Sequence, residues 1–285
     1  MSSQQLVHAK QWRDRKGRNV TSFEAWNQKC RVLPRSPFKA TFTMRSPIAV
    51  TDYIHFDALV WHAALEEQLG PAFWTQTGHE NYDLLVPLQP VTHVFTREGV
   101  VHRETGEPLR ITRKYSSASV GTYPNGFVEG VTAWRKRCDF PTSYGKVDTA
   151  RGMYKAFDTP LAYISTPKIV FYAVGNKPEV ERLLKTRISH VGKKRSQGYG
   201  RIGEITVEDC AVDYSVFRDD VLQRPIPASG CPWGFADPVE AYYAYKPPYW
   251  RRGNLTPCFM PGSVRLSNVQ RGQVMDNREK LTVPP

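Results

Sequence analysis

One stretch of the chain, residues 168–207, restricts the fold more than any other, because it contains a strand, a helix, a glycine-rich loop and a second strand in succession. Residues 168–174 form a short, mostly apolar run, which is typical of a buried strand. Residues 178–188 carry apolar side chains at helical spacing, and Pro178 stands in the first turn, where proline is favoured. Residues 202–207 return to a strand pattern. This unit predicts a fold that combines strands and helices.

A second strand and helix are predicted nearer the N-terminus. Residues 38–44 alternate apolar and polar side chains, as a half-buried strand does, and Pro47 ends the strand. Residues 55–69 again have apolar side chains at helical spacing. We expect Asp52 to cap this helix and Gly70, which precedes a proline, to end it. The chain thus contains two strand–helix units.

Outside these units the chain is expected to divide into further segments. Residues 1–36 are polar and basic, and we expect an extended or partly helical arm. Residues 37–210 form the predicted main domain, with a hairpin-rich insertion at about residues 96–130, where turn signals separate short strand-like runs. Residues 211–285 are rich in proline and aromatic residues, which predicts a loop-rich extension with a frayed end after about residue 270.

Composition limits the class of protein. The chain has 285 residues, 40% of them hydrophobic, so it can bury a substantial core. Its 39 Lys and Arg against 27 Asp and Glu give a net charge of +12, which suits a polyanionic partner, either nucleic acid or an acidic membrane surface. No stretch approaches the roughly 18 apolar residues of a membrane span, and no secretory signal is visible. The five cysteines lack zinc-finger spacing, so we expect reduced thiols in the cytoplasm and no metal.

The charge is distributed unevenly along the chain. Residues 46–96 contain no Lys or Arg, and residues 185–201 contain no Asp or Glu. The acidic residues of the first segment are Asp52, Asp57, Glu66, Glu67, Glu80 and Asp83. Such segregation favours a protein that lays one face along phosphates and another against a protein neighbour. The acidic segment would then face a basic protein or be paired within the chain, and clustering on solvated faces is the alternative.

The glycine-rich loop contains Gly198-Tyr-Gly-Arg-Ile-Gly203, which matches the G-x-G-x-x-G pattern. Dinucleotide binding needs a strand before that pattern and a helix after it, and here the order is reversed. Glycines instead let the main chain approach a phosphate, neighbouring cations add charge, and Tyr199 offers a ring to a base. The predicted RNA-binding residues of the loop are Gly192, Lys193, Lys194, Arg195, Ser196, Gln197, Gly198, Tyr199, Gly200 and Arg201. A flexible, solvated loop is the alternative.

The two strand–helix units, with a basic glycine-rich loop before the last strand, resemble the RAMP superfamily of CRISPR proteins. That superfamily is built on the ferredoxin-like, RRM-type βαββαβ fold, so the resemblance implies an α+β fold of this kind. Within the superfamily, Arg45-Ser-Pro-Ile-Ala-Val50 followed by Ile54-His-Phe-Asp-Ala-Leu59 resembles the type IV CRISPR subunit of the Cas-five kind, a Csf-type RAMP protein.

The resemblance implies a non-catalytic subunit of a type IV CRISPR effector ribonucleoprotein. Such a subunit binds the 5′ handle of the crRNA and caps one end of the backbone filament. Its partners would be the crRNA, the backbone subunit and the large-subunit equivalent, and a position near the PAM-side DNA duplex is left open. The resemblance also implies that residues 192–203 and Arg45 contact the crRNA, and that the insertion at 96–130 is a thumb-like element. No cofactor and no membrane contact are expected.

An enzyme is the main alternative. RAMP relatives that process crRNA cut RNA without metal, with a histidine as general acid or base and the 2′-OH as nucleophile. His62, in the predicted first helix, and His190, beside the loop, are the candidates for a metal-independent endoribonuclease. Residues 46–96, however, offer no Lys or Arg to stabilise the charge of the transition state. A stand-alone RNA-binding protein is the third possibility.

Overall fold

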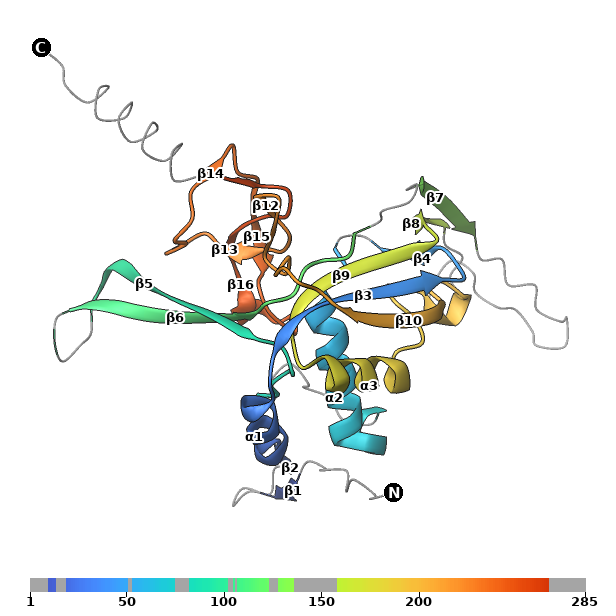
Figure 1. Ribbon diagram of the computed structural model, residues 1–285, viewed down its shortest axis with the longest axis horizontal. Coiled ribbons are helices and arrows are strands. Elements are labelled where there is room, and N and C mark those ends of the chain that lie inside the picture. Colours follow the sequence, from blue (N-terminus) through green and yellow to red (C-terminus); the bar gives the residue numbers. More distant parts are fainter. Residues whose placement is uncertain are drawn as a thin grey trace, which may run out of the picture.

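The protein is a mixed α and β structure with several small sheets and few helices. The computed structural model describes residues 10–13, 19–50, 53–74, 82–101, 105, 107–122, 128–135 and 158–266. The longest helices and the central sheet lie together on one side of the molecule, a two-stranded hairpin projects from the body, and a C-terminal extension packs beside the hairpin (Figure 1). This arrangement agrees with the α+β class expected from the sequence.

The central sheet has the strand order β10-β3-β9, and both pairings are antiparallel. Its strands are β3 (Ser36–Met44), β9 (Lys168–Gly175) and β10 (Ile202–Asp209), so the three predicted strands are confirmed. β3 buries every second side chain between Phe38 and Phe42, because successive side chains of a strand point to opposite faces. On the free edge of β9, residues 118–122 form isolated bridges to Ala173 and Val170.

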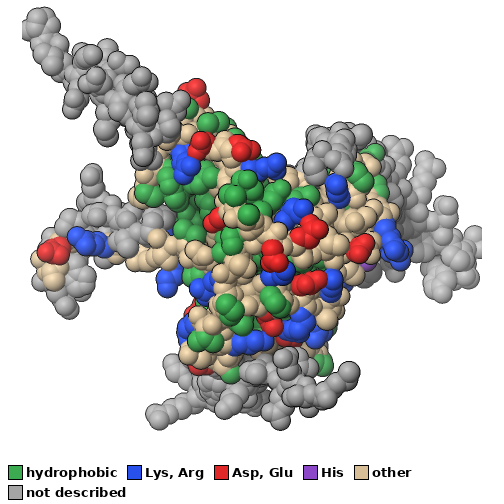
Figure 2. Space-filling view, viewed as in Figure 1, with side chains coloured by type: hydrophobic (Ala, Val, Ile, Leu, Met, Phe, Trp, Pro, Cys, Tyr) green, Lys and Arg blue, Asp and Glu red, His purple; other side chains and the backbone are tan. Residues whose placement is uncertain are grey.

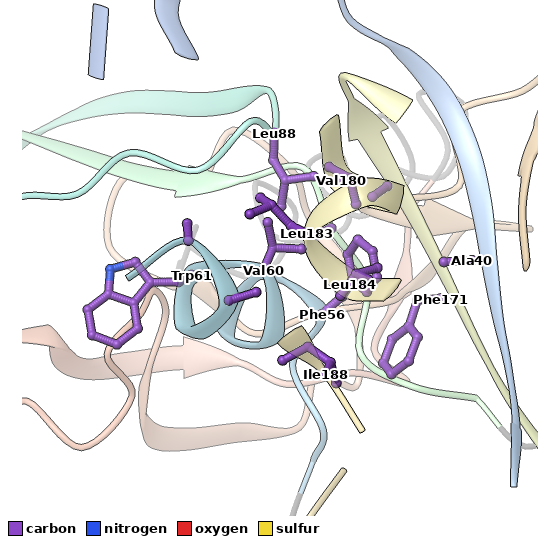
Figure 3. Close-up of a cluster of buried hydrophobic side chains, with 14 of the residues drawn as sticks. Ala40, Phe56, Val60, Trp61, Leu88, Phe171, Val180, Leu183, Leu184 and Ile188 are labelled. Carbon is purple, nitrogen blue, oxygen red and sulfur yellow. The ribbon is translucent and has the colours of Figure 1, made fainter. Parts of the chain in front are cut away.

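Two helices cover one face of this sheet (Figure 1). They are α2 (Phe56–Leu69) and α3 (Lys177–Arg187), close to the predicted bounds. Figure 3 shows side chains of both helices directed toward one another and toward Phe171 of the sheet. Burying each large apolar side chain contributes about 1.5–3 kcal/mol, so the packing of the helices on the sheet stabilises the fold.

The starts of the two helices differ in how they are capped. At α3 the Asn176 side-chain oxygen accepts the Glu179 N–H at 3.1 Å, and Pro178 stands in the first turn as expected. The residue before α2 is His55, whose side chain makes no capping hydrogen bond. The predicted cap, Asp52, lies outside the described residues.

The described part of the basic N-terminal arm is more closely packed than an extended arm would be. β1 (Lys10–Arg13) pairs with β2 (Asn19–Ser22), and α1 (Glu24–Val32) follows. Trp26 of α1 is 2% exposed and belongs to the main core, and its indole N–H donates to the Leu85 carbonyl at 2.8 Å. The helical part of the arm is therefore held by the domain, while the proposed boundaries at residues 36 and 210 stay predictions.

A two-stranded hairpin overlaps the start of the predicted insertion. β5 (Pro90–Val101) and β6 (Pro108–Ser116) are antiparallel and project away from the body (Figure 1). β7 (Val128–Arg135), at the end of the insertion, belongs to a separate sheet in the order β4-β8-β7. The other strands of that sheet are β4 (Ile48–Ala49) and β8 (Asp158–Ser165).

The C-terminal extension is built from short strands, in agreement with its high proline content. The strands form two small sheets in the orders β11-β12-β17-β14 and β13-β16-β15 around a second, smaller core. Their bounds are β11 (Phe217–Arg218), β12 (Val221–Leu222), β13 (Ile226–Pro227), β14 (Phe235–Ala236), β15 (Glu240–Ala244), β16 (Leu255–Phe259) and β17 (Val264–Arg265). The terminus expected to fray after about residue 270 lies outside the described residues.

A buried polar network joins the extension to the first turn of α2. Asp57 and Arg224 are each 1% exposed, and their closest charged atoms are 3.6 Å apart. The Asp57 carboxylate also accepts the Ser116 hydroxyl at 2.6 Å and the Tyr249 hydroxyl at 2.8 Å. Burial, followed by the nearby Asp57 carboxylate, raises the pKa of Tyr249 well above its usual value, so this phenol remains a donor. The network fixes the extension against the helical layer.

Candidate nucleic-acid interface

The predicted RNA-binding loop connects α3 to β10 and lies on the surface. Residues 192–198 are exposed, Tyr199 is half-buried and Gly200 is buried. Main-chain hydrogen bonds hold the two ends of the loop to the segment after β3: the Lys193 N–H donates to the Ala49 carbonyl, and the Gly200 N–H donates to the Pro47 carbonyl, both at 2.7 Å. The loop is therefore anchored at its base and open to a ligand along its length.

Glycine is required at the base of the loop for a steric reason. Gly200 has a φ of 69°, and a Cβ atom there would lie 1.8 Å from the Val191 carbonyl oxygen. Gly198 has a φ of 87°, yet a Cβ at that position would meet nothing within 4 Å. The short 3-10 helix η5 (Arg195–Gln197) directly precedes Gly198 and exposes Ser196 and Gln197 to solvent. Gly200 thus closes the base of the loop, and Gly198 shapes its exposed tip.

This contrast predicts different costs for two alanine substitutions. Gly200→Ala should lower the free energy of unfolding by more than about 2 kcal/mol, because a left-handed backbone costs a non-glycine residue about 1–2 kcal/mol and the clash with Val191 adds to it. Gly198→Ala should incur only the backbone cost. Chemical denaturation of the two variants measures the difference. Equal destabilisation would contradict this account of the loop base.

Three of the loop cations have no carboxylate partner among the described residues. Among the described residues, Lys194, Arg195 and Arg201 are exposed and have no ion pair with an acidic side chain. By contrast, Lys39 of β3 pairs with Glu208 at 2.8 Å, and Lys177 at the start of α3 pairs with Asp209 at 2.5 Å. Figure 2 shows acidic and basic side chains intermingled over the face seen there. The loop therefore carries three exposed cations that no described carboxylate pairs with.

The acidic segment at residues 46–96 is partly paired within the chain. Both oxygens of the buried Glu67 carboxylate accept the Arg182 guanidinium at 2.7 Å, and Asp57 lies beside Arg224. For these two carboxylates, intramolecular pairing, one of the two expected arrangements, is confirmed. Asp52 and Glu80 lie outside the described residues.

Arg45 lies next to the loop, although many residues separate them in sequence. The main-chain N–H of Arg45 donates to the Arg201 carbonyl at 2.8 Å, and its side chain covers Gly203, where an added Cβ would be 3.1 Å from the Arg45 Cγ. The Arg201 N–H donates to the Ser46 hydroxyl at 2.8 Å. The turn after β3 and the loop consequently form one surface, which carries Arg45, Arg201 and the loop lysines.

The two histidine candidates lie in different surroundings. His190 precedes the loop, its Nδ1 is 2.9 Å from the Ser189 hydroxyl, and partial burial, Arg195 and Arg201 lower its pKa. His62 lies on α2 with its ring edge-on to Phe73 at 5.1 Å. A lowered pKa disfavours the protonated imidazole that a general acid requires at neutral pH.

Sequence reasoning missed two aromatic residues beside the loop. The guanidinium carbon of Arg195 is 5.9 Å from the centre of the Trp74 ring, and Trp74 is 63% exposed. The Tyr163 and Tyr199 rings are 6.4 Å apart. Trp74 belongs to the segment that lacks Lys and Arg, and Tyr163 belongs to a different sheet, so no local sequence signal connects either residue to the loop.

Two structural absences apply to the described part of the chain. No group of three or more His, Cys, Asp or Glu side chains there could hold a metal ion. None of the helices described is long and apolar enough to cross a membrane.

The fold and the loop together define the class of protein. It is a mixed α and β protein with a loop of basic side chains and glycines before the edge strand of its sheet. The family described as CRISPR type IV associated protein Csf3 matches residues 99–261, which include the projecting β6 strand, the loop and most of the described C-terminal extension. Because this match covers more than half of the chain, the protein belongs to the Csf3 family.

No curated protein matches this sequence. A chain in a solved structure titled "Cryo-EM structure of the Type III-B Cmr-beta bound to cognate target RNA" is 14% identical, with a TM-score of 0.32. The match covers 66% of this chain and 65% of that chain. A TM-score this low does not establish a shared fold.

Proposed function

We propose that the protein is a non-catalytic crRNA-binding subunit of a type IV CRISPR effector ribonucleoprotein. In this proposal the loop at residues 192–203, together with Arg45, binds the 5′ handle of the crRNA, and the subunit caps one end of the backbone filament. The observation that carries the proposal is an exposed cationic loop in a member of a type IV CRISPR family, in which Lys194, Arg195 and Arg201 have no acidic partner among the described residues.

The proposal includes a ferredoxin-like core for this domain. The support is the strand order β10-β3-β9, with residues 118–122 beside β9 and both helices on one face. In a βαββαβ core the fourth, first, third and second strands lie side by side in that order. Residues 118–122 would then stand in the place of the second strand, and β10 would be the last strand, directly after the loop.

The assembly partners in the proposal are the backbone subunit and the large-subunit equivalent, in the cytoplasm. The projecting β5–β6 hairpin is proposed as the thumb-like contact to the backbone subunit. We further propose that the assembled complex brings this subunit near the PAM-side duplex of the target DNA.

Purified protein should bind a crRNA with a strong dependence on salt. If Lys193, Lys194, Arg195 and Arg201 each contact a phosphate, the slope of log affinity against log salt should be about −3, at roughly −0.7 per phosphate of a single strand. Fluorescence anisotropy over a range of salt concentrations measures this slope. Absence of binding, or a slope near zero, would overturn the proposal.

A cleavage assay distinguishes the proposed binding subunit from an endoribonuclease. Repeat RNA incubated with the protein in EDTA should be recovered intact, because the proposed subunit only binds it. Specific cleavage that disappears in His190→Ala or His62→Ala would instead favour the enzyme.

A further inference from the structure

We propose that Trp74 is a base-stacking platform beside the glycine-rich loop. A nucleobase from a single-stranded part of the bound RNA stacks on the indole ring while the loop holds neighbouring phosphates. The inference rests on the proposed function and deepens it, because it states that the site takes unpaired bases as well as a phosphate backbone.

The neighbouring residue fixes the position of Trp74. Trp74 ends the 3-10 helix η1 (Gly70–Trp74), directly after α2. Phe73 is 8% exposed, packs edge-on against His62, and also meets the Trp74 ring edge-on at 5.0 Å. Because Phe73 is inserted into the core, Trp74 must project outward, and 63% of it remains exposed. The ring is therefore held at its base by Phe73 and remains largely exposed to solvent.

Arg195 connects this ring to the loop. Its guanidinium carbon lies 5.9 Å from the ring centre, within range of a cation–π interaction. Such an interaction at an exposed site changes an equilibrium by about two- to five-fold. Stacking of a nucleobase on an aromatic side chain changes affinity by about 5- to 150-fold. A base can therefore displace Arg195 from the ring, which leaves the guanidinium available to a phosphate.

The chemistry of the ring also indicates the ligand. Bases inside a duplex are already stacked on one another, so the platform requires a single-stranded segment. Every base offers a π-face, and the indole ring alone therefore gives little sequence preference. The platform should thus strengthen binding to single-stranded RNA of many sequences, in addition to the charge of the loop.

The test uses the full chain and a fluorescein-labelled 12-nucleotide single-stranded RNA in an anisotropy titration. Trp74→Ala and Trp74→Leu should each weaken binding by about 5- to 150-fold, while Trp74→Phe should retain most of the affinity. Leucine keeps an apolar side chain but has no π-face, so an equal loss in Ala and Leu assigns the effect to the ring and not to apolar contact. The slope of log affinity against log salt should not change, since none of these variants removes a charge.

Two controls sharpen the result. Trp250→Ala removes a tryptophan of similar exposure, 65%, that meets Trp61 edge-on, and it should leave affinity unchanged. An oligomer of abasic ribose phosphate should bind wild type and Trp74→Ala equally. If wild type binds RNA but Trp74→Ala and Trp74→Leu bind equally well, or if Trp250→Ala loses as much, the platform is wrong and the proposed function stands. If wild type binds no RNA, both are overturned.

Discussion

Replacing Arg224 with alanine should lower the free energy of unfolding by about 3–5 kcal/mol, because it leaves Asp57 buried without its cation. The loss extends beyond one ion pair. The Arg224 guanidinium donates to the main-chain carbonyls of Ser116 and Tyr245, the second at 2.5 Å, and these acceptors would also lose their donor. Since Tyr245 belongs to the C-terminal extension and Asp57 to α2, the variant should loosen the extension from the domain. Denaturant unfolding of the full chain measures the change.

An exposed arginine provides the matched control. Arg31 pairs with Glu24 at 3.0 Å on the surface of α1, and Arg31→Ala should cost no more than about 1 kcal/mol. A double variant that replaces both buried partners, Asp57→Leu with Arg224→Met, should be more stable than Arg224→Ala alone, because neither charge is then left unpaired. A loss below about 1 kcal/mol for Arg224→Ala would show that the network does not hold the extension in place.

Reversal of three loop charges should weaken RNA binding by well over tenfold. In the variant Lys193→Glu/Lys194→Glu/Arg195→Glu, each cation that would meet a phosphate is replaced by a carboxylate that repels it. The slope of log affinity against log salt should also fall in magnitude by about 2, at roughly 0.7 for each of three lost contacts. Both quantities come from anisotropy titrations with the crRNA at several salt concentrations.

The control must change the net charge by the same amount elsewhere. Arg110 and Lys114 on the hairpin and Arg252 in the extension are exposed, so reversal of all three gives an equal loss of positive charge. Long-range attraction should decline equally in both triple variants. Only the loop variant should also lose the local contacts and change the salt slope. If the two variants weaken binding equally, the loop does not contact the RNA.

Sequence alone located the elements that depend on local patterns. Strand alternation and helical spacing gave the strands β3, β9 and β10 and the helices α2 and α3 within a few residues. Such patterns are visible because one face of each element is buried. Both strands of the β5–β6 hairpin lie where the sequence shows short strand-like runs between turn signals, while the bounds of the insertion, at about residues 96–130, stay a prediction.

Packing between distant segments was not predictable. The segment that forms α1 contains Lys29 and Arg31 and was therefore expected to belong to a basic arm. Only the fold shows that Trp26 and Cys30 of the same helix are buried in the core. The structure places Arg45 beside the predicted loop residues. Their contact with RNA stays a prediction.

The sequence by itself determined the strand–helix units, the cationic glycine-rich loop between α3 and β10, and the family resemblance that these carry, because each depends on neighbours along the chain. The tertiary structure alone decided that Asp57 meets Arg224, that Glu67 meets Arg182 and that Trp74 lies beside Arg195. These pairs are more than 100 residues apart in sequence. Contacts of that kind form only when folding brings separate elements together to bury apolar surface, and no periodicity within a single segment records them.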